Sequence, residues 1–333
     1  MPPFFARALT GALSCLACTA ALAHEPLDVV TVVKVMPLPW FTRMAQGVMV
    51  HDAALGGGRA HLLGPAKAEA ALQAALIQKL LLTEPLPKAL AIVPTDPQAV
   101  DGLARQALEK GVVVVTHEAD NLVNTQADLE PFDALSFGAA LNRRLVECMG
   151  GRGQWTTFVG TRSSRTHLRW IEGAVANAAA HPQMALIEPL NESHDDAEQA
   201  YQRSRELLQR HPQLRGFQGA ASSDVIGIAR AVQELQPRRP VCVVGTGLPA
   251  RSREGLEAGS IHAIGFWDPR DAGLALNRLA QRLVQGVPLS EGMDLGVPGY
   301  RQLRLRPGPG RGVVLTGDAA VVVGRDAARA YAF

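Results

Sequence analysis

Short runs of β-branched and other apolar residues alternate with longer amphipathic stretches along most of this chain. Runs such as 28–33 lack the strict polar alternation of a half-exposed strand, which is typical of parallel strands covered on both faces. In the first part of the chain, the pattern predicts strands at 28–33, 60–63, 89–93 and 112–116 and helices at 42–55, 68–82 and 97–109. Such strand–helix–strand units predict a doubly wound α/β domain with a parallel sheet and right-handed crossovers.

The same rhythm restarts after a loop expected at 118–133, which predicts a second lobe of the same class. The predicted helices are 139–149, 165–180, 195–209 and 224–235, and the predicted strands are 155–159, 184–189, 214–219 and 240–244. The last expected elements are a strand at 261–266, a helix at 270–285 and short strands at 302–305 and 313–315. The chain has 333 residues, more than one core usually holds, and this also favours two lobes.

The late elements indicate that the chain returns to the first lobe and crosses again. We therefore expect residues 24–135 and 266–297 in the N-terminal lobe, and residues 136–265 and 298–333 in the C-terminal lobe. Several crossings would form a hinge, with a cleft between the lobes in which closure could enclose a ligand.

Residues 1–23 have the character of a cleavable secretion signal. They carry one charge, Arg7, followed by an apolar stretch that ends in Ala-Leu-Ala. This predicts cleavage after Ala23 and a mature protein in the periplasm. The apolar run is shorter than the roughly 20 residues that a spanning helix needs, and a lipid anchor through Cys15 or Cys18 is the second interpretation.

Charge and cysteine content narrow the class of protein. The formal net charge of +2 gives no electrostatic reason to expect binding to nucleic acid or to an anionic membrane surface. Cys148 and Cys242 would remain after signal cleavage. An oxidising compartment would allow them to pair, but the apolar run around Cys242 favours a buried free thiol.

Charged side chains follow the predicted strands, at the edge where open α/β sheets bind ligands. They are Lys34, Asp96, Glu118, Asp224 and Asp268. Asp96 and Asp224 also stand at the start of predicted helices, so helix capping is an equal interpretation for both. A lysine cannot cap a helix N-terminus and is rarely buried unpaired, so we expect Lys34 to contact the ligand or a ligand-bound carboxylate.

Aromatic and basic residues extend this set. Trp40, Phe41 and Trp267 lie beside turns at the same predicted sheet edge. We expect Trp267 in the cleft, whereas Trp40 and Phe41 could equally stack on a ligand or fill the core. Arg162 and His167 belong to a basic cluster after the strand at 155–159. That cluster could bind an anionic group at a helix start or form a solvated helix face.

Enzyme signatures are weak in this chain. A dinucleotide-binding enzyme would need Gly-x-Gly-x-x-Gly after the first strand, where the sequence has Lys-Val-Met-Pro-Leu-Pro, and no Gly-x-Ser-x-Gly occurs. His194, Asp195 and Asp196 could suggest a metal, but helix capping by Asp195 is the preferred interpretation. A glycosidase stays open as an alternative because its two carboxylates have no fixed spacing. No cofactor or metal is expected, and a repressor would need a helix-turn-helix where the signal lies.

Five segments carry a family resemblance: 34–42, 92–97, 115–120, 244–249 and 265–269. In this order they resemble the periplasmic sugar-binding proteins of ABC importers, the type I periplasmic binding proteins, and most of all the autoinducer-2 and rhamnose branch. The resemblance implies two doubly wound lobes joined by three crossings. It also implies a monomer that binds one sugar-like molecule in the cleft and delivers it to a membrane permease. A sensor module that reports to a receptor kinase is the alternative fate.

The resemblance can be carried over by residue. Lys34 matches the lysine that autoinducer-2 binders place on a ligand oxygen, and Glu118 falls where they have an aspartate. Where that branch has an acid and an amide before a tryptophan, this chain has Thr166 and His167, and Ser222 stands in a ligand-contacting stretch. These departures favour a different polyhydroxy ligand, or the same ligand held differently.

Overall fold

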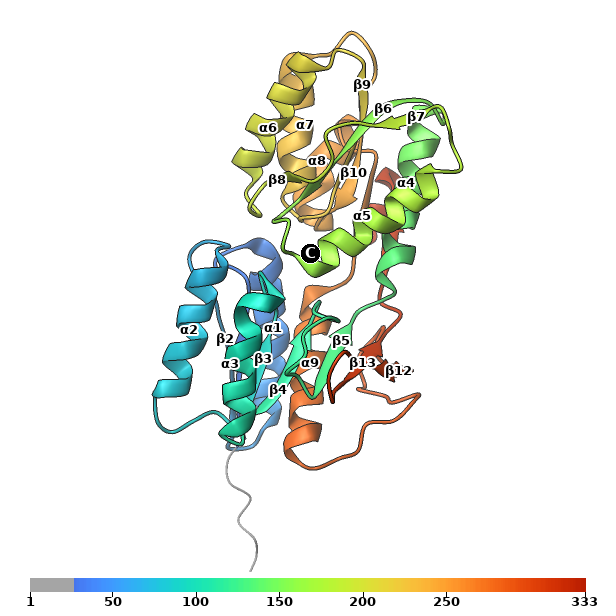
Figure 1. Ribbon diagram of the computed structural model, residues 1–333. Helices are drawn as coiled ribbons and strands as arrows, with labels where there is room; N and C mark the ends of the chain where they lie inside the picture. The colour runs from blue at the N-terminus through green and yellow to red at the C-terminus, as the bar shows by residue number, and fades with distance from the viewer. Residues whose placement is uncertain (1–26) are drawn as a thin grey trace, which may run out of the picture.

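The computed structural model describes residues 27–333, which form two α/β lobes, one above the other in Figure 1. The expected signal segment and its cleavage after Ala23 lie outside the described residues. Each lobe is built on a twisted sheet with helices on both faces, and each sheet consists mostly of parallel strands. The doubly wound, two-lobed architecture predicted by the strand–helix rhythm is therefore confirmed.

The N-terminal lobe contains a seven-stranded sheet in the order β12-β13-β5-β4-β3-β1-β2. Its parallel strands are β1 (Asp28–Val32), β2 (Arg59–Leu63), β3 (Ala89–Ile92), β4 (Val113–His117), β5 (Ala127–Glu130) and β13 (Val313–Thr316), and β12 (Arg304–Pro307) runs antiparallel at the edge. Its helices are α1 (Pro39–Ala54), α2 (Ala70–Leu82), α3 (Pro97–Glu109) and α9 (Pro269–Val284).

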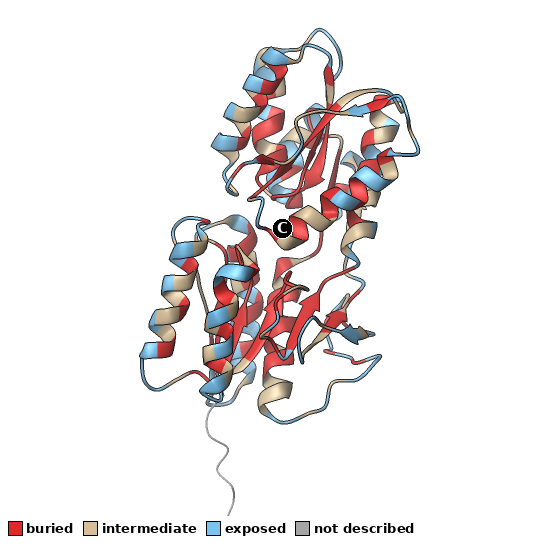
Figure 2. Ribbon diagram, in the orientation of Figure 1, coloured by how far each residue is buried: buried red, intermediate tan, exposed pale blue. Residues whose placement is uncertain are grey.

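Alternate residues of β1 face two different cores, which explains its continuous apolar run. Val29 packs in the cluster that contains Met44 of α1, whereas Val30 packs in the cluster that contains Ile77 of α2 and Val100 of α3. All five of these side chains are buried, and Figure 2 shows the strands of both sheets as buried layers. A strand that is covered on both faces gains burial from every side chain, so it needs no polar alternation.

The C-terminal lobe contains a second sheet in the order β14-β11-β10-β9-β6-β7, with the short β8 also pairing with β6. Its strands are β6 (Gly153–Val159), β7 (Met184–Leu186), β8 (Asn191–Glu192), β9 (Leu214–Gly219), β10 (Cys242–Thr246), β11 (Ala263–Phe266) and β14 (Val321–Val323). Its helices are α4 (Ala134–Met149), α5 (Arg165–Ala178), α6 (Ala197–Arg210), α7 (Asp224–Leu235), α8 (Pro249–Ala258) and α10 (Arg325–Ala328).

Three crossings join the lobes: β5 to α4, β11 to α9, and β13 to β14. The last crossing corrects the sequence-based boundary, which placed all of 298–333 in the C-terminal lobe. Strands β12 and β13 extend the first sheet, because β13 pairs in parallel with β5, and only β14 and α10 belong to the second lobe. Non-local pairing of this kind leaves no local sequence signal, so the crossing point was predicted about 20 residues too early.

Strand β5 lies inside the segment that the sequence predicted to be a loop, 118–133. Its sequence Ala-Asp-Leu-Glu is half acidic, yet all four residues are buried. The Asp128 carboxylate accepts hydrogen bonds from the Thr116 hydroxyl at 2.7 Å and from the Ala119 N–H at 3.0 Å. Tertiary hydrogen bonds to one oxygen of Asp128 thus hold a buried acid that, from composition alone, indicated a loop.

Cys148 and Cys242 form a disulfide between the end of α4 and the start of β10, with 6.0 Å between their Cα atoms. The expected free thiol at Cys242 is therefore wrong. Helix α4 packs against β10, and Met149 at its end lies in the same core cluster as Cys242. The apolar surroundings of Cys242 reflect this packing and do not exclude a partner cysteine. None of the helices within residues 27–333 combines the length and apolar character that crossing a membrane requires.

Candidate functional site between the lobes

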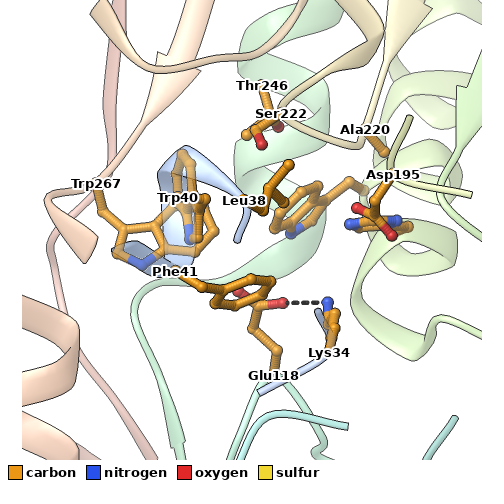
Figure 3. Close-up of a pocket in the computed structure, with 12 residues that line it drawn as sticks. Lys34, Leu38, Trp40, Phe41, Glu118, Asp195, Ala220, Ser222, Thr246 and Trp267 are labelled. Carbon is orange, nitrogen blue, oxygen red and sulfur yellow. Dashed lines mark hydrogen bonds and ion pairs between the residues drawn. The ribbon is translucent and has the colours of Figure 1, made fainter. Parts of the chain in front are cut away.

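A cavity with about 310 Å³ of empty space lies between the two lobes, where the ends of strands from both sheets meet (Figure 3). Both lobes and the second crossing contribute to its wall. The lining residues are Lys34, Leu38, Trp40, Phe41, Glu118, His167, Trp170, Asp195, Ala220, Ser222, Thr246 and Trp267. Seven of the residues predicted from the sequence therefore meet at one place, although they come from distant parts of the chain.

An ion pair between Lys34 and Glu118 forms the N-terminal-lobe part of the wall. Lys34 Nζ lies 2.8 Å from Glu118 Oε2, and each side chain is only 5% exposed. Burial alone would lower the pKa of Lys34, but Glu118, Asp195 and other nearby acids outweigh burial and raise it. The lysine therefore stays charged, and its position after β1 agrees with the sequence prediction.

Glu118 adopts an unusual backbone conformation directly after β4, with φ of 61°. A left-handed conformation is uncommon for a residue other than glycine, and such residues concentrate at binding and active sites. The Glu118 carbonyl oxygen accepts a hydrogen bond from the Thr166 hydroxyl of the opposite lobe at 2.8 Å. This residue therefore takes part in the cavity wall and in the contact between the lobes.

Four large aromatic side chains enclose the cavity: Trp40, Phe41, Trp170 and Trp267. The Trp40 and Trp267 rings lie edge to face with centroids 4.6 Å apart, and Trp170 is 5.7 Å from Trp267. The indole nitrogens of Trp170 and Trp267 have no hydrogen-bond partner within the described part of the chain. Buried donors without partners are rare in proteins, so these two donors remain available to a bound molecule.

His167 faces the cavity as a neutral hydrogen-bond donor. Its Nδ1 accepts a hydrogen bond from the Gly160 N–H at 3.0 Å. Burial, and then the charge of Lys34, lower the pKa of His167 well below its ordinary value. A neutral imidazole whose Nδ1 is an acceptor carries its proton on Nε2, so it can donate a hydrogen bond from that atom.

The structure adds five residues to the wall that were not among the predicted site residues: Leu38, Trp170, Asp195, Ala220 and Thr246. The Thr246 hydroxyl stands at the end of β10 and has no partner among residues 27–333. The sequence predicted that Asp195 caps a helix, but this residue lines the cavity instead. Burial raises its pKa, the charge of Lys34 opposes this, and Glu118 adds to it.

Asp96 and Asp268 do not line the cavity, because both cap helices. Asp96 accepts from the Gln98 N–H at 2.9 Å at the start of α3. Asp268 accepts from the Arg270 N–H at 2.9 Å at the start of α9, and it also pairs with Arg43 at 2.7 Å.

Asp224 and Arg162 also lie outside the cavity wall. Asp224 is fully buried beneath it, where its carboxylate accepts from the Ala221 N–H at 2.8 Å and burial raises its pKa to about 7. Arg162 points along the surface loop, where its Nε donates to the Leu190 carbonyl at 3.0 Å. The Asp224 carboxylate therefore holds the loop that presents Ala220 and Ser222.

A second, more polar cavity with about 780 Å³ of empty space lies beside the hinge. Three of its charged groups pair with one another: Asp120 Oδ1 accepts from Arg165 Nε, and Asp120 Oδ2 accepts from Arg306 Nη2, both at 2.8 Å. The Arg165 pair crosses from one lobe to the other. These contacts bridge the lobes, as the Thr166 hydrogen bond does, and describe a cleft in a closed arrangement.

Comparison with known proteins identifies this architecture. A family model for the periplasmic binding protein domain matches residues 29–288. An ABC transporter solute-binding protein from Clostridium phytofermentas, with bound L-rhamnose, superposes with a TM-score of 0.83 at 17% identity, covering 92% of this chain and 98% of that one. LsrB from Clostridium saccharobutylicum, in complex with AI-2, gives 0.82 at 18% identity, covering 92% and 99%.

A solute-binding protein from Burkholderia graminis, in complex with D-arabinose, has a TM-score of 0.75 at 18% identity and covers 92% of this chain and 98% of that one. At these identities, the likeness to all three structures concerns the fold. The family model spans most of the chain, and its two-lobed fold is the one seen here with three crossings and an interlobe cavity. The chain belongs to the periplasmic binding protein family.

Proposed function

We propose that this protein is the periplasmic solute-binding component of an ABC importer. It captures a sugar, or an autoinducer-2-like polyhydroxy molecule, by closure of its hinge and presents it to a permease in the inner membrane. The carrying observation is the cavity between the lobes, in which a buried Lys34–Glu118 pair stands beside aromatic rings. We propose that it acts as a monomer; the site is formed within one chain, so ligand capture needs no second copy.

The chemistry of the wall supports a small polyol. Hydroxyl groups both donate and accept hydrogen bonds, so they can use a lysine ammonium, carboxylates, a neutral histidine and a threonine hydroxyl at once. The aromatic rings offer flat apolar faces to the C–H faces of a sugar ring.

The similar proteins support the same class of ligand. The three structures described above hold L-rhamnose, AI-2 and D-arabinose, all small and rich in oxygen. Because their identity to this chain is low, the ligand of this protein can differ from each of theirs. Pentoses, 6-deoxyhexoses and autoinducer-2 are therefore the compounds to test first.

A thermal-shift screen of residues 24–333 against these compounds tests the proposal. A ligand that binds the folded state alone at 100 times its Kd stabilises it by about 2.7 kcal/mol, which raises the melting temperature visibly. Calorimetric titration of the same compound should then show one site per chain.

Lys34→Ala is expected to abolish binding in protein that circular dichroism shows to be folded. Lys67→Ala is the matched control, because Lys67 is 76% exposed and does not line the cavity, and it should bind as the unmodified protein does. Lack of binding to every sugar and to autoinducer-2 would count against the proposed ligand class.

A further inference from the structure

Asp195 brings into the cavity a carboxylate that the described part of the chain does not satisfy. It lies in the loop between β8 and α6 and lines the wall opposite the Lys34–Glu118 pair (Figure 3). Within residues 27–333 no group donates a hydrogen bond to this carboxylate or lies in ion-pair distance of it. The one lysine in the wall is already bonded to Glu118, so Asp195 remains an acceptor without a donor.

The loop backbone holds Asp195 in this position at some conformational expense. His194 and Asp195 both have left-handed backbones, with φ of 52° and 55°. The turn is fixed by hydrogen bonds from the His194 N–H to the Gly160 carbonyl at 2.8 Å and from the Asp196 N–H to the Ser193 carbonyl at 2.9 Å. Residues kept in this region of φ are typical of functional sites, where the surrounding structure imposes them.

Helix α6 does not need Asp195, because the next residue caps it. The Asp196 carboxylate accepts from the Glu198 N–H at 2.7 Å and from the Gln199 N–H at 3.1 Å. The two adjacent acids therefore divide two tasks: Asp196 satisfies the free N–H groups of the helix, and Asp195 turns to the cavity.

Gly160 makes the space that Asp195 occupies. A Cβ atom on Gly160 would lie 2.5 Å from Asp195 Oδ2 and 3.0 Å from its Cγ, closer than real side chains approach. The φ of Gly160 lies outside the left-handed region, so the backbone there would accept an L-residue. The absence of a side chain at Gly160 therefore leaves room for the Asp195 carboxylate, and the backbone conformation does not require a glycine there.

We propose that Asp195 is a ligand-binding residue, which accepts hydrogen bonds from hydroxyl groups of the bound polyol, and that Gly160 determines specificity by admitting it. This assignment rests on the proposed function. A carboxylate can accept from two neighbouring hydroxyls at once, so the site selects ligands that present a hydroxyl pair to the C-terminal lobe. The ligand then bridges acids of both lobes, Glu118 on one and Asp195 on the other.

Asp195→Asn tests the assignment by calorimetric titration with the sugar that the unmodified protein binds. Hydrogen bonds to a charged group are strong, so Kd should rise about 10- to 100-fold. Asp196→Asn is the matched control, with the same change one residue along. Asparagine is also a good helix cap, so this variant should keep its melting temperature and bind within about twofold of the unmodified protein.

Gly160→Ala is a second, independent test, since it leaves the carboxylate in the chain and displaces it from the cavity. It should weaken binding to a similar degree, and the double variant with Asp195→Asn should be little worse than either single variant, because both remove one interaction.

The outcomes separate this assignment from the proposed function. Sugar binding by the unmodified protein, with Kd in both single variants within twofold of it, overturns the role of Asp195 and leaves the proposed function standing. Absence of any sugar binding by the unmodified protein overturns the proposed function and, with it, this assignment. A loss confined to Asp195→Asn and Gly160→Ala, with Asp196→Asn unaffected, establishes both residues as parts of the site.

Discussion

The two lobes line the same cavity with polar groups that differ in whether they already have hydrogen-bond partners. The N-terminal lobe presents a completed pair, in which Lys34 and Glu118 satisfy each other at 2.8 Å. The C-terminal lobe presents groups that have no partner within residues 27–333, chiefly the Asp195 carboxylate and the Thr246 hydroxyl. A paired wall is stable before the ligand arrives, whereas an unpaired wall gains its hydrogen bonds only from the ligand.

This difference suggests an order of events. The N-terminal lobe can hold the ligand first, on a surface that is already organised. Closure then brings the open acceptors and donors of the C-terminal lobe onto the ligand, so that binding energy from those groups favours the closed state. The comparison predicts large stability effects from changes to the N-terminal pair and mainly binding effects from the C-terminal groups.

The largest expected effect is on stability, from Glu118→Gln. This change leaves the buried Lys34 charge without its carboxylate, and breaking one side of a buried pair destabilises by about 3 to 5 kcal/mol. Urea unfolding measures it. Glu69→Gln is the control, because the Lys67–Glu69 pair is exposed and should contribute less than about 1 kcal/mol. Equal small effects of both variants would remove the distinction between a buried, organised pair and a surface pair.

Reduction of the disulfide should destabilise the C-terminal lobe and leave the stability of the N-terminal lobe unchanged. Cys148 and Cys242 enclose a loop of 94 residues in the C-terminal lobe, and the described part of the N-terminal lobe contains no cysteine. Loss of such a crosslink destabilises by about 2 to 5 kcal/mol. Hydrogen exchange with and without a reductant should show faster exchange in β10 and α4 and unchanged exchange in β1 and β3. Uniform acceleration in both lobes would contradict independent behaviour.

The pH dependence of stability should involve both lobes. Burial raises the pKa of Asp128 to about 6 in one lobe and that of Asp224 to about 7 in the other. A raised pKa means that these two carboxyl groups bind more protons in the folded state than in the unfolded state between about pH 4 and 7, so their contribution to stability falls as pH rises through this range. Together they contribute on the order of 2 to 4 kcal/mol more stability at pH 5 than at pH 8. Buried histidines such as His51 and His167, whose pKa burial lowers, act in the opposite direction, so the carboxyl contribution is measured by comparison with variants that lack it.

Asp224→Asn sharpens this pH test, because asparagine can still accept from the Ala221 N–H and does not titrate. Relative to the unmodified protein, the unfolding free energy of this variant at pH 5 should fall by on the order of 2 kcal/mol more than at pH 8, because the proton that Asp224 gains on folding is lost. Asp96→Asn, at an exposed helix cap, is the control and should retain the full difference between pH 5 and pH 8. A variant with an unchanged pH profile would show that Asp224 does not titrate in this range.

The smallest expected effect concerns the contact between the lobes. Thr166→Val removes the hydroxyl that donates to the Glu118 carbonyl across the cleft, at nearly constant volume. One neutral hydrogen bond contributes about 1 kcal/mol, so we expect Kd to rise about fivefold through loss of closed-state stability. Small-angle scattering should show a larger average radius without ligand. Unchanged affinity and radius would mean that this bond does not favour closure.

Sequence patterns placed most elements and part of the site. The predicted bounds of α3 and α7 match the structure because Asp96 followed by Pro97, and Asp224 before an apolar stretch, are strong helix starts. Helix α8 was not predicted, and α4 begins five residues before its predicted start. Helix α6 begins at Ala197, two residues later than expected, and that small error concealed Asp195 as a site residue.

By itself, the sequence determined the doubly wound lobes, the position of Lys34 at the end of β1 and the aromatic character of the site. These follow from local periodicity and from where a strand must stop, and both are properties of neighbours in the chain. Only the tertiary structure decided that β13 returns to the first sheet, that Cys148 meets Cys242, and that Asp195 rather than Asp196 enters the cavity. Each depends on contacts between distant segments, such as Gly160 beside Asp195, and a pattern along the chain does not encode those distances.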